Sequence, residues 1–129
     1  MAQAALQAVR EQLAPTGVLR AAINMSNFLL VTGREADGCT PAGVSPDLAR
    51  AVADRLGVDL ALVPFEGPGV LADAVALTDD GSGAPHPQAW DIGNIGAEPE
   101  RAKTICFTPP YCEIQATYLV SDDHQPSSF

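Results

Sequence analysis

The feature that most constrains the fold is a well-delimited helix pattern between two apolar runs. The helix pattern begins at Ser45, the expected N-cap, has Pro46 in its first turn, and stops at Gly57. Apolar runs at 18–24 and 58–64 flank this helix and are typical of buried strands. A crossover of this length suits parallel pairing of the two strands, with a right-handed connection. The segment therefore predicts an α/β fold.

The expected helix has one core face and one solvent face. Apolar residues recur at a spacing of four and are joined by alanines; they are Val44, Leu48, Val52 and Leu56, with Ala49 and Ala53 beside them. On the other face, Arg50 and Asp54 have the spacing of an outward ion pair. We expect the apolar face to pack on the sheet.

Further elements are expected along the rest of the chain. They are helices at 3–13, 67–77 and from 98, strands at 90–95, 104–107 and 113–120, and a long connection at 25–43. The length of 129 residues fits one compact domain. We expect an amino-terminal helical appendage at 1–16, an α/β lobe at 17–120, a flexible insertion at 78–89 and a frayed tail at 121–129.

The charge balance excludes two classes of partner. Seven Lys and Arg against 16 Asp and Glu give a formal net charge of −9. Nucleic acids and anionic membranes are both bound by basic faces, so neither is expected as a partner. The net charge leaves room for one local cationic site that binds an anionic small molecule.

Cysteine and histidine usage predicts neither a metal site nor a cofactor. The three cysteines cannot form a closed disulfide framework, although Cys106 and Cys112 could pair across the turn between them. Paired Cys-x-x-Cys spacing is missing, and both histidines lie in Pro-rich or terminal polar stretches. The amino end has no signal-peptide pattern, which indicates a cytoplasmic chain or a signal already removed. Apolar runs long enough for a transmembrane helix are also missing.

The candidate binding site lies where three strands end. The loops at 24–43, 65–67 and 93–101 should meet at one edge of a parallel sheet. In the last loop, the backbone amides of Gly96 and Ala97, those of the turn after Pro99, and the guanidinium of Arg101 together suit a carboxylate. The alternative is that Arg101 simply pairs with Glu98 or Glu100 on the surface.

Four segments in order carry a family resemblance. They read GVLRAAI at 17–23, GVSPDLARAVADRLGV at 43–58, WDIG at 90–93 and ERAKTICFTPPY at 100–111. In this order they resemble the amino-terminal half of extracellular solute-binding protein family 3, the type 2 periplasmic binding proteins for polar amino acids. The resemblance implies an open, mostly parallel sheet flanked by helices, as one of two lobes that close on a ligand. The second lobe and the segment that returns to the first are not in this sequence, so an exposed face is expected.

The resemblance also implies ligand-binding residues. They are Asn24, Asn27 and Phe28 after the first strand, Asn94, Ile95 and Gly96 after the Asp-Ile strand, and Arg101 as the carboxylate clamp. Two departures stand beside them: Glu98 replaces a usual Thr, and Leu29-Leu30 replaces a usual Pro-Phe. A carboxylate at 98 can hold Arg101 or repel an anionic ligand.

The leading hypothesis is a non-enzymatic domain that binds an amino acid or similar small carboxylate. The resemblance implies delivery to an ABC importer permease and a periplasmic or extracellular location, against the missing signal pattern. One alternative is a truncated lobe that self-associates, as a homodimer through the face of the missing lobe. Another is an enzyme like the cyclohexadienyl dehydratases, for which Glu98 is the one general-acid candidate near the clamp.

Overall fold

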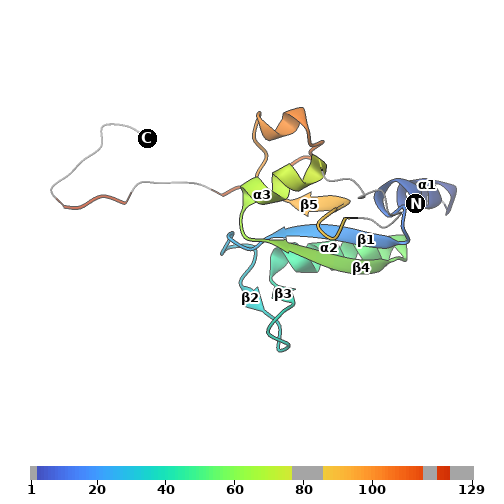
Figure 1. Cartoon of the computed structure of the whole chain (residues 1–129), viewed down its shortest axis with the longest axis horizontal. Coiled ribbons are helices and arrows are strands. Elements are labelled where there is room, and N and C mark those ends of the chain that lie inside the picture. Colours follow the sequence, from blue (N-terminus) through green and yellow to red (C-terminus); the bar gives the residue numbers. More distant parts are fainter. Residues whose placement is uncertain (1–2, 77–85, 115–118, 123–129) are drawn as a thin grey trace.

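A three-stranded parallel sheet forms the centre of the structure (Figure 1). The computed structural model describes residues 3–76, 86–114 and 119–122. Its helices are α1 (Gln3–Leu13), α2 (Val44–Leu56) and α3 (Pro68–Asp73), with 3-10 turns η1 (Ala74–Ala76) and η2 (Arg101–Lys103). Its strands are β1 (Val18–Asn24), β2 (Gly33–Arg34), β3 (Pro41–Ala42), β4 (Asp59–Phe65) and β5 (Ile92–Asn94).

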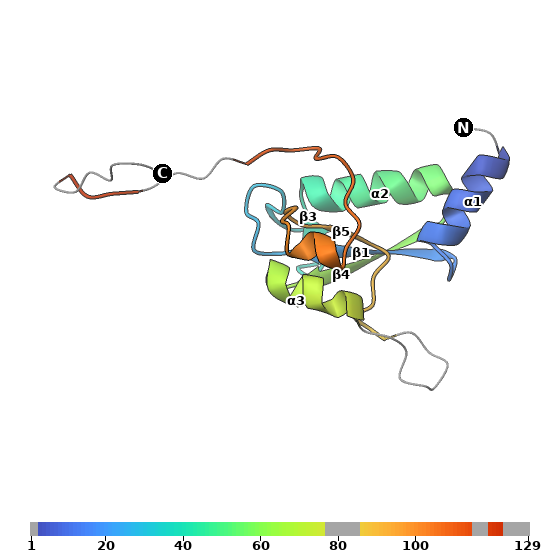
Figure 2. The ribbon, with the colours of Figure 1, turned by 90° about the horizontal axis from the view of Figure 1, so that it is seen from above.

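The strand order is β4-β1-β5, with β1 parallel to both neighbours. Along its whole length β1 pairs with β4, from Val18 opposite Asp59 to Asn24 opposite Phe65. In Figure 2 the sheet lies between α2 on one face and α3 on the other. The expectation of an α/β fold with an open, mostly parallel sheet flanked by helices is confirmed.

The core has one cluster on each side of β1. Ala22, Phe65, Leu71 and Ala74 form the cluster beneath α3. The second cluster joins Ala14, Leu19 and Ala53, from the end of α1, from β1 and from α2. A central parallel strand is covered on both faces, and this explains why β1 is an almost continuous apolar run.

The start of α2 differs from its prediction. Gly43 is the N-cap, with φ of 139°, whereas Ser45 lies inside the helix and is buried. A side chain on Gly43 would meet the Leu30 carbonyl oxygen at 2.5 Å, so the close approach of the preceding loop requires glycine here. The predicted end at Gly57 is correct, because this glycine takes the left-handed conformation with φ of 69°.

The buried face of α2 is also rotated from the predicted one. Ala49, Ala53 and Leu56 are buried, whereas Val44 and Leu48 are exposed. Alanines let the helix axis come closer to the sheet than valine and leucine would, so the small residues take the contact face.

The predicted pair of Arg50 with Asp54 was wrong. The Arg50 guanidinium instead lies 3.6 Å from Asp47 and 3.7 Å from Glu35, which belongs to the loop between β2 and β3. The long connection at 25–43 therefore has structure of its own, the antiparallel pair of β2 and β3, and it is tied to α2 through Arg50.

The carboxyl-terminal quarter contains less regular structure than expected. The helix expected from 98 is only the turn η2, and the described residues of the two expected strands, 104–107, 113–114 and 119–120, are not in strands. Pairing requires a neighbour, and β5 offers an edge of only three residues. Residues 77–85, 115–118 and 123–129 lie outside the described residues. They include most of the expected insertion, the middle of the strand expected at 113–120 and most of the expected tail.

The amino-terminal helix α1 packs against the end of α2. Arg10 donates from Nε to the carbonyl oxygen of Leu56 at 2.7 Å, and Ala14 is buried against Leu19. This contact satisfies one of the last carbonyls of α2, which have no partner within the helix.

The helices in the described part of the chain are too short or too polar to cross a membrane. All three cysteines are free and exposed, so Cys106 and Cys112 do not form a disulfide.

Candidate functional site

The carboxyl ends of β1, β4 and β5 lie along one edge of the sheet, because the three strands are parallel. Asn24, the last residue of β1, is opposite Phe65, and Asn94, the last residue of β5, is opposite Ile23. The two asparagines are therefore brought to neighbouring strand ends, as the sequence predicts. The backbone N–H of Met25 extends this pairing with a hydrogen bond of 2.9 Å to the carbonyl oxygen of Phe65.

The loop after β1 is shaped by its own asparagines. Asn24 accepts through Oδ1 from the hydroxyl and backbone N–H of Ser26, at 2.7 and 3.1 Å. Asn27 accepts through Oδ1 from the backbone N–H groups of Leu29 and Leu30. Both are local turn contacts, and they leave each Nδ2 group without a hydrogen bond to the described residues. Phe28 projects from the same loop and is 83% exposed.

At the end of β5, Asn94 contacts a residue that the sequence analysis did not select. Its Nδ2 donates to the phenol oxygen of Tyr111 at 3.1 Å. The two residues are 17 apart in sequence, and Tyr111 is half exposed. The Pro-Pro-Tyr turn was the available signal, but spacing alone did not relate it to β5. Ile95 instead packs against the cluster beneath α3, so its side chain belongs to the core.

Arg101 folds back on the loop that carries it. Its Nη1 donates to the carbonyl oxygen of Gly96 at 2.9 Å and lies 3.5 Å from the Glu98 carboxylate. Of the two carboxylates that spacing offered as partners, Glu98 is the one that lies beside Arg101. Only Nη1 takes part, and Nε and Nη2 make no hydrogen bond to the residues that the structure describes. The side chain is 19% exposed, whereas that of Glu98 is 59% exposed.

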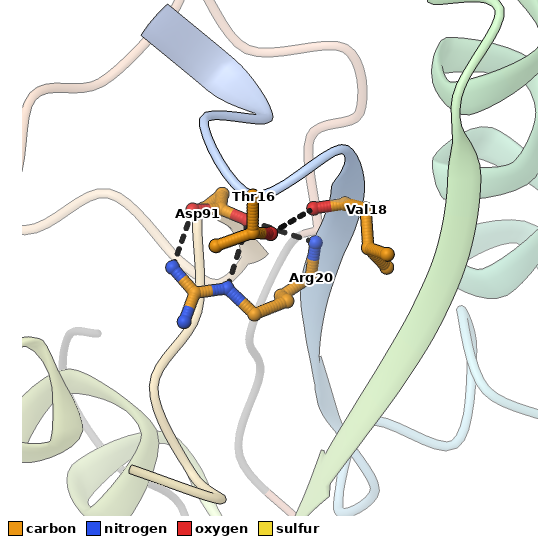
Figure 3. A network of polar contacts seen from close by, with 4 residues as sticks. All are labelled: Thr16, Val18, Arg20 and Asp91. Carbon is orange, nitrogen blue, oxygen red and sulfur yellow. Dashed lines mark hydrogen bonds and ion pairs between the residues drawn. The ribbon is translucent and has the colours of Figure 1, made fainter. Parts of the chain in front are cut away.

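A second arginine, Arg20, forms an ion pair within the fold, near the amino-terminal ends of β1 and β5. Arg20 on β1 donates from Nε and Nη2 to the two carboxylate oxygens of Asp91, at 3.0 and 2.7 Å (Figure 3). The backbone N–H of Arg20 also donates to Oδ2 of Asp91, and the backbone N–H of Asp91 donates to the carbonyl oxygen of Arg20. The Asp91 hydrogen bonds raise the pKa of Arg20, against the opposing effect of burial. Sequence analysis missed this pair because its members are 71 residues apart.

Two grooves of the surface are lined by residues other than Arg101. One groove of about 400 Å³ lies against the outer part of β4 and is lined by Cys39, Thr40, Pro41, Arg50, Leu60, Leu62 and Pro64. Another, of about 260 Å³, is lined by Phe65, Val70, Asp73, Ala74 and Gln88. In the described part of the chain, no cluster of three or more His, Cys, Asp or Glu side chains could hold a metal ion.

Comparison with solved structures relates this fold to a known one. The chain matches the crystal structure of an ancestral cyclohexadienyl dehydratase with a TM-score of 0.58 and 26% sequence identity. The match covers 87% of this chain and 40% of that chain. The chain has the fold of a type 2 periplasmic-binding-protein lobe. No family model and no curated protein matches the sequence.

This match corrects the expectation of a protein that is not an enzyme. The matched structure is that of a dehydratase, so a lobe of this fold also occurs in an enzyme. The sequence motifs that carried the resemblance belong to the strands, the helix and the turns of the lobe. Such elements specify a fold, and one fold can carry both binding proteins and enzymes.

Proposed function

We propose that this lobe binds a small carboxylate at the carboxyl edge of its sheet, with Arg101 as the cation. The fold supports the location, because ligands of open α/β sheets bind outside the carboxyl ends of the strands. Arg101 supplies a local positive charge beside the end of β5, although the chain as a whole has a net charge of −9.

The observation that carries the proposal is that only Nη1 of the Arg101 guanidinium contacts the described residues, which leaves Nε and Nη2 for a ligand. Nη1 is anchored on the carbonyl oxygen of Gly96, and this contact fixes the guanidinium plane. Nε and Nη2 form the outer side of the fork, which matches the two oxygens of a carboxylate. A ligand could therefore bind on this side while the Gly96 contact is kept.

Glu98 competes with a ligand for the charge of Arg101 without occupying the Nε and Nη2 side. Its carboxylate lies 3.5 Å from Nη1 and is largely in water, where an ion pair contributes about 0–1 kcal/mol. A pair this weak leaves the guanidinium able to attract a ligand carboxylate. The Nδ2 groups of Asn24 and Asn27, which are unbonded among the described residues, are further donors at the same edge.

Calorimetric titration with a panel of amino acids and simple carboxylates tests the proposal. We expect Arg101→Ala to weaken carboxylate binding at least tenfold, the loss of about one charge-assisted hydrogen-bond pair. Lys103→Ala is the matched control, because Lys103 is on the same turn η2 and pairs with Glu100 in solvent. Equal affinity in wild type and Arg101→Ala would overturn the proposal.

Dehydratase activity is a second candidate, favoured by the match to an ancestral cyclohexadienyl dehydratase. Glu98 is then the general acid, because its carboxyl group is beside the cation that would bind the substrate carboxylate. Incubation with prephenate and arogenate tests this function. Activity that is lost in Glu98→Gln and kept in Glu100→Gln would support it, and absence of product in wild type would reject it.

The transport partner, the homodimer and the compartment stay predictions. The self-association alternative rests on exposed apolar side chains near the sheet edge, with Phe28 83% and Leu29 65% exposed. Light scattering after size-exclusion chromatography tests it, and a monomer at all concentrations would reject it.

A further inference from the structure

The contact between Asn94 and Tyr111 brings an aromatic ring to the proposed carboxylate site. Asn94 ends β5, and the loop that holds Arg101 starts two residues later at Gly96. The hydrogen bond of 3.1 Å from Asn94 fixes the phenol group of Tyr111 at this strand end. A residue from beyond η2 is thereby returned to the edge of the sheet.

The direction of this hydrogen bond determines what the phenol can still do. Asn94 donates through Nδ2, so the oxygen of Tyr111 is the acceptor. A tyrosine hydroxyl carries one proton of its own, and here that proton is not used in the contact with Asn94. The hydroxyl can therefore donate to a ligand oxygen while it keeps its contact with Asn94.

The ring of Tyr111 is also open to a ligand. Tyr111 is 51% exposed, and it is one of few aromatic residues in the chain, which make up 5% of it. Aromatic rings stack on other rings with a favourable offset or edge-to-face geometry, and their polar tips bind at the same time. A half-exposed phenol that is anchored on Asn94, two residues before the Gly96 carbonyl that holds Arg101, offers both a stacking surface and a donor.

From these contacts we propose that Tyr111 is a ligand-contacting residue, and that it makes the site selective for carboxylates that carry a ring. The inference rests on the proposed carboxylate site at Arg101 and adds its substrate class. The guanidinium binds the carboxylate, the Tyr111 ring stacks on the ligand ring, and the phenol hydroxyl donates to a ligand oxygen.

Titration with four probes tests the selectivity: L-phenylalanine, L-tyrosine, L-leucine and L-alanine. Wild type should bind the two ring-bearing probes about two- to tenfold more tightly than leucine, the range expected for one aromatic pair. Tyr111→Leu should abolish this preference. Tyr111→Phe should keep the preference, because the ring remains, and should weaken binding of all probes that accept the hydroxyl proton.

Two controls separate this inference from the proposed function. Leu48→Ala removes an exposed apolar side chain from α2 and should leave all four affinities unchanged. In the free protein, Tyr111→Phe should shift the side-chain amide resonances of Asn94, which reports the contact without any ligand.

The outcomes are distinct. If carboxylates bind through Arg101 but ring-bearing probes have no advantage, or if Tyr111→Leu keeps that advantage, the inference is wrong and the proposed function stands. If no probe binds wild type, both fail together.

Discussion

Arg20 and Asp91 form a bidentate ion pair that joins β1 to the residue before β5. Three hydrogen bonds from Arg20 to the Asp91 carboxylate and one between their backbones join them, at distances from 2.7 to 3.0 Å. Since β5 has only three residues, this pair supplies much of what holds the strand in register, with Ala21 opposite Ile92. Asn94 owes its position at the sheet edge to the same register.

Removal of the Asp91 carboxylate should destabilise the fold. Asp91→Ala leaves the Arg20 guanidinium, which is only 21% exposed, without its partner. We expect a loss of about 2 kcal/mol in the free energy of unfolding, below the value for a fully buried pair because Arg20 keeps some contact with water. Urea denaturation measures it. Arg50→Ala, which removes two loose surface pairs, is the control and should change stability by less than about 0.5 kcal/mol.

A side chain at Gly43 should be more damaging than one at other glycines. Gly43→Ala places a Cβ 2.5 to 2.9 Å from backbone atoms of residues 30–32, at a φ of 139°. We expect a loss of more than about 2 kcal/mol, because backbone must move. Gly69→Ala in α3 meets nothing within 4 Å and should be neutral or stabilising by up to about 1 kcal/mol. Thermal unfolding of the two variants should rank them in this order; equal midpoints would contradict the role of Gly43.

Asp37 should stay ionised, and so keep stabilising the turn between β2 and β3, down to low pH. The Thr40 hydroxyl, and then the backbone N–H groups of Thr40 and Cys39, hold the pKa of Asp37 at about 2, below its ordinary value of 3.8. Because the folded-state pKa is the lower one, this contribution to stability is present above pH 3.8 and is lost as the pH falls through about 2. The amide resonances of Cys39 and Thr40 should titrate with a midpoint near that value. A midpoint at 3.8, or an unchanged profile in Asp37→Ala, would show that the carboxylate is not held.

Removal of the Glu98 charge should strengthen carboxylate binding. Glu98→Gln removes the competitor that lies 3.5 Å from Arg101. Because the pair is exposed, we expect a gain of about two- to fivefold in affinity, which falls as salt is added. Titration of the same probe in low and high salt measures it, with Glu100→Gln as the matched control on the same turn. Weaker binding in Glu98→Gln would mean that the carboxylate itself holds the ligand.

The local elements were predictable because their signals are local. β1 has the predicted bounds of 18–24, and β4 is shifted by one residue from 58–64. The helix between them ends at the predicted glycine. The helical crossover predicts parallel strands. Parallel strands in turn place Asn24 and Asn94 at the same edge of the sheet, which requires no knowledge of side-chain contacts.

Contacts between distant segments were not predictable. The partner of Arg101 could be narrowed to Glu98 or Glu100 by spacing, but only the fold shows that Nη1 also reaches Gly96. The hydrogen bond from Asn94 to Tyr111 is likewise one that no sequence spacing indicates.

The sequence by itself determined the α/β class, the end of the main helix, its flanking strands to within one residue, and the acidic surface, because capping, periodicity and charge act over a few residues or over the whole composition. Only the tertiary structure decided that Ala49 and Ala53, rather than Val44 and Leu48, face the sheet. It also decided the pairing of Arg20 with Asp91. These depend on how closely two surfaces can approach and on which groups remain to be satisfied when they meet, and neither quantity exists until the chain is folded.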